Sequence, residues 1–328
     1  MRKGLAFTGL MVLAGAAWAG DAVVVVRGSA GLPEYGERFE EEAALWAEAA
    51  RTAEARWQEV PPTPEQGKAV AAALQQAIEA KPERLWVLLC GHGTFDGREA
   101  RFNVEGPDFT PKDLQQWLRS WQGPLVLVHT GSASQPFAKA LAGPERVCVT
   151  ATKSGSEVFS TRFGLPFARA MGGELKADLD QDGQVSVLEA FLDAAAEVRD
   201  FYQSEERLAT EHALLDDDGD GVGTRSERFD GVDLREKPGQ GTTAVGDGAR
   251  ARRVVLVRSA EERQLTPEQR ARRDELEMAL EDLKKQRDSL DAAGFEKRAR
   301  AILLELARMY EQAEAAAAAP KGTGQAPR

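Results

Sequence analysis

The sequence is poor in cysteine and in positive charge, and each shortage removes a class of protein. Two cysteines in 328 residues are too few for the disulfide framework of a small secreted domain. Acidic residues outnumber Lys and Arg by 53 to 42, giving a net charge of -11. So negative a chain lacks the excess cations that neutralise phosphates, so no nucleic-acid partner is expected.

Long hydrophobic runs are also scarce, and the one that stands out lies at the start. Arg2 and Lys3 precede an apolar stretch that ends in the small residues Ala17 and Ala19. This pattern is typical of a cleaved signal peptide, which we predict over residues 1–19. The mature chain is then exported, periplasmic or secreted, with no membrane span. An uncleaved N-terminal anchor is the alternative, and it too places the rest outside the cytoplasm.

Short apolar runs with many β-branched residues alternate with helical patterns. The runs predict buried strands at 23–26, 85–89, 125–128 and 147–149. The patterns between and after them predict helices at 38–57, 65–80, 111–121, 162–171 and 187–203. This alternation favours an α/β fold, a mostly parallel sheet with helices on both faces. Functional residues in such sheets follow the carboxyl ends of the strands.

The remainder of the chain predicts a linker and a helical hairpin. We expect the α/β domain over 20–235, a flexible Gly- and Thr-rich linker over 236–253, and a disordered tail over 316–328. Residues 254–315 carry leucines at coiled-coil spacing and a break at Gly294, which predict an antiparallel α-helical hairpin. The hairpin packs internally or on the sheet, or it mediates self-association. Val254 to Val257 is either a short edge strand or part of the linker.

The strongest local motif is an EF-hand-type calcium loop at 178–189. Aspartates at loop positions 1, 3 and 5 converge on the ion, Gly183 permits the sharp turn, and a glutamate closes the loop in bidentate fashion. The predicted calcium ligands are Asp178, Asp180, Asp182, Gln184 through its carbonyl, Ser186 through water, and Glu189. The alternative is an acidic turn before a helix that binds no metal.

A second loop of this type is predicted at 216–227. Its predicted ligands are Asp216, Asp218, Asp220, Val222 through its carbonyl, Thr224 and Glu227. Gly223 stands where an apolar residue usually anchors the loop, and no clear helix follows it. A flexible acidic loop is therefore the alternative here. Ca²⁺ is the one cofactor that the sequence predicts.

A second motif is the histidine between glycines, Gly91-His92-Gly93, that follows the predicted strand at 85–89. The next strand ends in His129-Thr130-Gly131-Ser132, and Val147-Cys148-Val149-Thr150-Ala151-Thr152 follows further on. The pattern over residues 22–203 resembles the caspase-like cysteine peptidases of the legumain and gingipain type. This resemblance implies that His92 is the acid/base and that the nucleophilic cysteine belongs in the turn after the following strand.

This sequence departs from the family pattern at the nucleophile. Gly131 aligns best with the nucleophile position, and glycine has no side chain to attack a carbonyl. The resemblance therefore implies a pseudopeptidase. The alternative is a hydrolase, a peptidase or esterase, that uses Ser132, or the nearby Ser134, with His92. Asp96 and Glu157 are the carboxylates that would orient the histidine in that case.

Two further interpretations concern the cysteines and the histidines. Cys90 and Cys148 are read as small buried residues, with a disulfide between them left open. A transition-metal site on His92 and His129 lacks a third ligand at suitable spacing.

We predict a calcium-binding pseudopeptidase that binds a peptide or protein. A protein that pairs with a partner through its calcium loops, similar to dockerin-type modules, is a further alternative.

Overall fold

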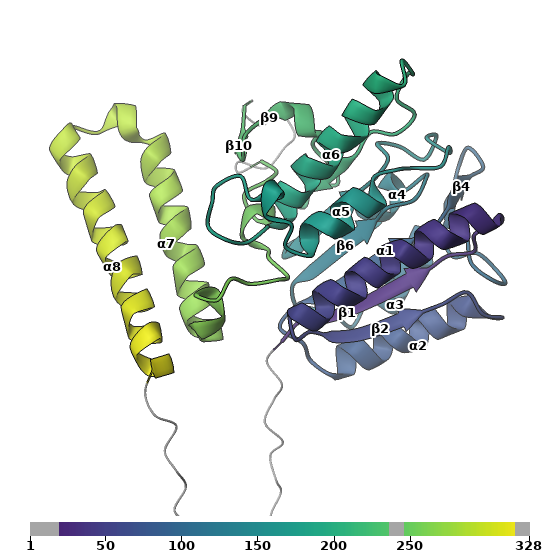
Figure 1. Cartoon of the computed structure of the whole chain (residues 1–328), viewed down its shortest axis with the longest axis horizontal. Coiled ribbons are helices and arrows are strands. Elements are labelled where there is room, and N and C mark those ends of the chain that lie inside the picture. Colours follow the sequence, from purple (N-terminus) through teal and green to yellow (C-terminus); the bar gives the residue numbers. More distant parts are fainter. Residues whose placement is uncertain (1–19, 236–245, 319–328) are drawn as a thin grey trace, which may run out of the picture.

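The computed structural model describes residues 20–235 and 246–318 (Figure 1). The predicted signal peptide, residues 236–245 of the predicted linker and residues 319–328 of the predicted tail lie outside these ranges.

A six-stranded sheet forms the centre of the α/β part, in the order β2-β1-β3-β6-β7-β8. Five strands are parallel, and β8 runs antiparallel to β7 at one edge. The strands are β1 (Ala22–Arg27), β2 (Arg56–Val60), β3 (Leu85–Cys90), β6 (Leu125–His129), β7 (Arg146–Thr150) and β8 (Leu214–Asp216). The inner strands β1, β3 and β6 are apolar up to their last residue because helices cover both faces of the sheet. The predicted α/β fold class is confirmed.

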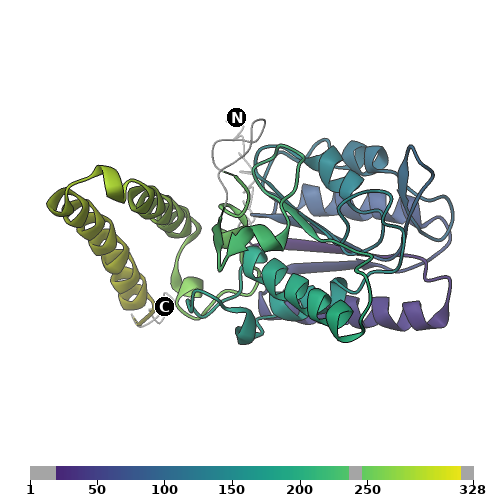
Figure 2. The same ribbon diagram turned by 90° about the horizontal axis from the view of Figure 1, so that it is seen from above.

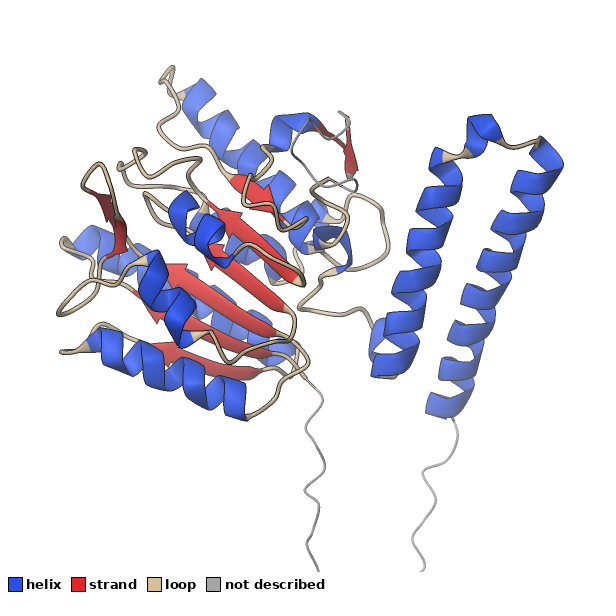
Figure 3. Cartoon of the chain, turned by 180° about the vertical axis from the view of Figure 1, so that it is seen from behind, coloured by secondary structure: helices blue, strands red, loops and turns tan. Residues whose placement is uncertain are grey.

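Two helical layers enclose the sheet (Figures 1 and 3). One layer consists of α1 (Pro33–Thr52), α5 (Gly164–Met171) and α6 (Val187–Ser204). The other consists of α2 (Gln66–Glu79), α3 (Pro111–Trp117) and α4 (Gln135–Leu141). Trp46, Phe167 and Phe191 fill the core beneath the first layer. Leu74 and Phe137 belong to the core beneath the second.

Two small β-hairpins form two-stranded sheets of their own, separate from the central sheet. The first, formed by β4 (Gly93–Phe95) and β5 (Ala100–Phe102), begins immediately after His92. The second, formed by β9 (Phe229–Asp230) and β10 (Asp233–Leu234), follows the predicted calcium loop at 216–227, called the second acidic loop below, as the loop at 178–189 is called the first.

The C-terminal helices α7 (Pro267–Lys285) and α8 (Ala292–Ala318) form an antiparallel hairpin that projects from the α/β part (Figure 2). Ion pairs hold α7 near both of its ends, because Arg270 in its first turn reaches Glu83 at 3.2 Å and Glu281 near its C-terminal end reaches Arg253 at 2.8 Å. At the base of the hairpin, Leu265 packs against Met309 of α8. Of the helices in the described ranges, none combines the length and apolar character needed to cross a membrane.

Several predicted boundaries were wrong. The helix predicted at 38–57 ends at Thr52, after which Glu54 adopts a left-handed φ of 54° and the chain enters edge strand β2. The hairpin break lies before Gly294, which is in the first turn of α8 and donates its N–H to Asp291 at 2.5 Å. Residues 316–318 of the predicted tail continue α8.

The predicted flexible linker was also wrong over its described part. Asp247 and Ala251 are buried, and a short 3₁₀ helix spans Ala251–Arg253. Val254 to Val257 forms no regular strand, although Val255 makes one isolated bridge to Ser186. This segment packs on the first acidic loop, because the Val187 N–H donates to the Val254 carbonyl at 2.8 Å.

Candidate functional site

The sheet brings the ends of β3 and β6 together, as predicted for adjacent parallel strands. The His92 ring lies edge-on between two aromatic rings of α1, with centroid distances of 4.6 Å to Tyr35 and 5.0 Å to Phe39. Partial burial, and then the positive charge of Arg38, lower the pKa of His92. The imidazole is therefore neutral at neutral pH and able to accept a proton.

The turn that contains Gly131 is pressed against the turn that contains His92. A Cβ atom at Gly131 would lie 2.1 Å from the Gly91 carbonyl oxygen, and one at Gly93 would lie 2.2 Å from the Ser132 carbonyl oxygen. Real Cβ atoms do not approach other atoms this closely, so no side chain fits at either position without backbone movement. Gly131, the position predicted from the resemblance to correspond to the nucleophile, therefore has no room for a side chain.

Both serines considered as nucleophiles have hydrogen-bonded hydroxyl groups. The Ser132 hydroxyl donates to the Gly93 carbonyl at 2.9 Å and accepts from the Gly93 N–H at 3.1 Å, and the residue is 1% exposed. The Ser134 hydroxyl pairs with the Thr152 hydroxyl at 2.8 Å. These bonds fasten the turn to its neighbours. Ser132 lies beside the residue that follows His92, but its bonds are to backbone rather than to the imidazole.

The carboxylates suggested as orienting groups have other partners. Asp96 accepts the backbone N–H groups of residues 98 and 99 and pairs with Arg101 at 3.1 Å. Glu157 pairs with the ring of His212 at 2.5 Å. Both contacts direct these carboxylates toward partners other than His92.

His129 is fully buried at the end of β6. Its Nδ1 accepts the Gly131 N–H at 3.1 Å, and burial lowers its pKa to about 3. Its ring packs edge-on against Phe137 at 4.9 Å. In the described part of the chain, the groups of three or more metal-ligating side chains consist of aspartates and include no histidine.

The two cysteines lie on opposite faces of the sheet and are both free. Burial raises the pKa of each thiol, and the neighbouring Glu42 carboxylate adds to this effect at Cys90. We expect both thiols to resist a thiol-reactive disulfide reagent in the folded protein and to react fully in guanidinium chloride, because the thiolate is the reactive form. Fast labelling of either thiol in the native protein would contradict this assignment.

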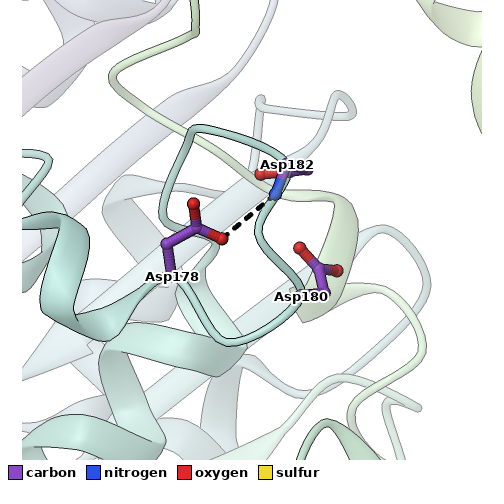
Figure 4. A group of neighbouring side chains, drawn as sticks. All are labelled: Asp178, Asp180 and Asp182. Atoms are coloured by element: carbon purple, nitrogen blue, oxygen red, sulfur yellow. Dashed lines mark hydrogen bonds between the residues drawn. The ribbon is translucent and has the colours of Figure 1, made fainter.

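The first acidic loop brings its three aspartates together (Figure 4). Oxygens of Asp178, Asp180 and Asp182 lie within 4.8 Å of one another. The Asp178 carboxylate accepts the N–H groups of Asp182 at 3.2 Å and Gly183 at 3.0 Å. Burial, followed by the charge of Glu189, raises the pKa of Asp180. The loop thus concentrates negative charge at one point.

Glu189 closes this loop from the first turn of α6. One carboxylate oxygen accepts the N–H of Leu179 at 2.8 Å and of Asp180 at 3.2 Å, and the other accepts the Ser186 N–H at 2.9 Å. Ser186 caps α6 in return, in a capping box. The Gln184 side chain bonds Asp182 at 3.1 Å. Hydrogen bonds thus join Glu189 to the loop backbone, and the group of carboxylate oxygens within 4.8 Å of one another consists of the three aspartates.

The second acidic loop is arranged differently from its predicted form. Asp216 and Asp218 lie within 4.8 Å of each other and of Asp247, which the sequence did not indicate as a ligand. Glu227 instead pairs with Arg225 at 2.6 Å. The Thr224 hydroxyl donates to Asp247 at 2.6 Å, and Val222 is 64% exposed.

The charges of this second group oppose one another. Burial, together with the neighbouring Asp220 and Asp218, raises the pKa of Asp216 to about 6. Burial and the charges of Asp217 and Asp218 raise the pKa of Asp247 to about 8. A divalent cation would offset this repulsion, and carboxylate oxygens are the ligands that calcium prefers. The donors at both loops therefore fit calcium.

No family model and no curated protein matches the chain. Among solved structures, caspase-1 from Spodoptera frugiperda is 12% identical, with a TM-score of 0.40 over 55% of this chain and 77% of that one. The Drosophila initiator caspase Dronc is 9% identical, with a TM-score of 0.40 over 60% and 79%. A protein of Geobacter sulfurreducens is 10% identical, with a TM-score of 0.39 over 63% and 97%.

Proposed function

We propose that this chain is an exported calcium-binding protein whose caspase-like domain binds a peptide or protein segment without cleaving it. The observation that carries the proposal is the Gly91 carbonyl oxygen, which occupies the space that a nucleophile side chain at Gly131 would need. The two aspartate groups support the calcium part of the proposal, because each gathers three carboxylates within 4.8 Å.

The contacts of Ser132 count against the hydrolase alternative. A serine nucleophile needs a base within hydrogen-bond reach, and the Ser132 hydroxyl instead both donates to and accepts from the Gly93 backbone. The observation that keeps this alternative worth testing is the position of Ser132 against Gly93, next in the chain to His92. The turn would have to rearrange before the Ser132 hydroxyl could pair with the His92 ring.

Turnover assays separate the two functions. We expect the chain from Gly20 onward to hydrolyse neither a fluorogenic peptide panel nor an ester panel, with or without calcium, and the variants His92→Ala and Ser132→Ala to be equally inactive. The controls are circular dichroism of each variant, which shows folding, and Ser156→Ala, which removes an exposed hydroxyl that bonds Ser154. Turnover that disappears in both His92→Ala and Ser132→Ala but persists in Ser156→Ala would establish the hydrolase instead.

A further inference from the structure

Asp247 lies far along the chain from the second acidic loop but belongs to it in space. It is 6% exposed, and one of its oxygens accepts the N–H groups of Asp217 at 2.9 Å and Asp218 at 3.3 Å. The other oxygen accepts the Thr224 hydroxyl at 2.6 Å. Asp247 is therefore bonded to both the beginning and the end of the loop.

Asp216 provides an independent indication of a missing ligand. The residue is 3% exposed, and one of its carboxylate oxygens accepts the Gly219 N–H at 3.1 Å. Its other oxygen, Oδ2, is buried and has no hydrogen-bond partner in the described part of the chain. The Oδ2 of Asp220 is in the same condition. Buried carboxylate oxygens normally have partners, so two such atoms in one acidic loop point to a cation-binding site.

Glu227 is held away from this group. Residues 215 and 224 bond each other through both backbone pairs, at 3.0 Å and 2.7 Å, which returns the chain to β8 at Thr224. A short 3₁₀ helix follows at Ser226–Arg228, and the Glu227 carboxylate pairs there with Arg225. A twelve-residue EF-hand loop would need this glutamate to turn back onto the ion.

We propose that Asp247, rather than Glu227, completes the second calcium site together with Asp216 and Asp218. This assignment rests on the proposed calcium-binding function. The carboxylate at the closing position is supplied by a separate segment, so the site joins two parts of the chain that lie about thirty residues apart.

Asp217 holds the segment that contains Asp247 in place through hydrogen bonds. Its carboxylate accepts the N–H groups of Gly248 at 2.8 Å, Arg250 at 2.7 Å and Ala251 at 2.6 Å. Asp217 therefore shapes the turn that delivers Asp247, while its neighbours Asp216 and Asp218 face the ion. Calcium at this site would fasten the segment that runs on to Val254 and the first loop.

A matched pair of variants tests the assignment by calorimetric titration with CaCl₂. Both are made in the chain from Gly20 onward with Asp180→Asn, which weakens the first site. Asp247→Asn and Glu227→Gln each remove one negative charge. We expect Asp247→Asn to weaken binding at the remaining site by roughly tenfold or more, and Glu227→Gln to change it by less than about twofold.

Melting curves in chelator and in calcium distinguish a ligand from a structural residue. If Asp247 is a ligand, Asp247→Asn reduces the calcium-induced rise in melting temperature. If Asp247 is only structural, the variant lowers the melting temperature equally in chelator and in calcium, and this result would overturn the assignment. If Asp247→Asn does not fold, Glu227→Gln decides alone, because strong loss of binding in that variant would refute the proposal. Absence of calcium binding in the unsubstituted chain would instead refute the proposed function itself.

Discussion

Replacing Gly131 with cysteine is expected to destabilise the protein strongly and to create no peptidase. The new Cβ would lie 2.1 Å from the Gly91 carbonyl oxygen and 3.1 Å from the His129 ring. Both neighbours are fixed, because Gly91 follows β3 directly and His129 is fully buried. Overpacking of this kind costs about 3 kcal/mol, which lowers the melting temperature by roughly 6 to 12 °C in a domain of this size.

Two further variants separate the steric effect from the chemistry of the thiol. Gly131→Ala should be nearly as destabilising, because the clash arises at the Cβ atom. Gly67→Cys should be close to neutral, since a Cβ there lies within α2 and meets only the Pro107 carbonyl oxygen at 3.7 Å. Thermal unfolding measures all three. A stable Gly131→Cys protein that cleaves peptides would show that the turn can open, and it would contradict the proposed non-catalytic function.

The inner strands of the sheet could be predicted because burial on both faces leaves a clear trace in the sequence. Val23 to Val26 and Leu85 to Leu89 are continuous apolar runs, and both are central strands. β2 has no such trace, since an edge strand half open to solvent tolerates Arg56 and Gln58. β8 is only three residues long and ends in the first aspartate of the acidic loop, so the loop pattern concealed it.

One of the two aspartate groups could likewise be predicted from the sequence, and the other could not. The three aspartates of the first loop all belong to one twelve-residue motif, so local spacing was enough to predict that they come together. Asp247 could not be found by spacing, because its position depends on tertiary hydrogen bonds to Asp217 and Thr224. The only sequence signal was an aspartate between Gly246 and Gly248 in a stretch that otherwise indicated a linker.

The steric closure at Gly131 was likewise beyond the sequence. The sequence shows that position 131 is a glycine. It does not show that the Gly91 carbonyl fills the space beside it, because this depends on how closely β3 and β6 bring their turns together. If the proposed loss of a nucleophile at Gly131 is correct, one substitution would restore it in an open crevice but not in a closed turn. From the sequence alone, a side chain introduced at Gly131 would be expected to fit, whereas the structure predicts that it clashes.

Calcium is expected to raise the melting temperature substantially, with a contribution from each loop. Glu189→Gln is expected to remove most of the contribution of the first loop. A ligand that binds only the folded state stabilises it by about 2.7 kcal/mol per site at a free concentration of about 100 times Kd. This corresponds to roughly 5 to 10 °C per site for a domain of this size. Glu189 is central because its carboxylate is the predicted closing ligand and already accepts the N–H groups of Leu179 and Ser186.

The controls must separate calcium binding from the structural bonds of Glu189. Glutamine keeps only one acceptor oxygen, so Glu189→Gln should also melt earlier in chelator, and the informative quantity is the calcium-induced rise in each variant. Asp180→Asn should reduce that rise with little effect in chelator, because within the described ranges its carboxylate bonds one side chain, Arg252, at a long 3.5 Å. Glu197→Gln, on the same helix but paired with Arg169, removes the same charge and should retain the full rise. If the unsubstituted protein shows no rise at millimolar calcium, the aspartate groups are structural acidic turns and the calcium assignment fails at both loops.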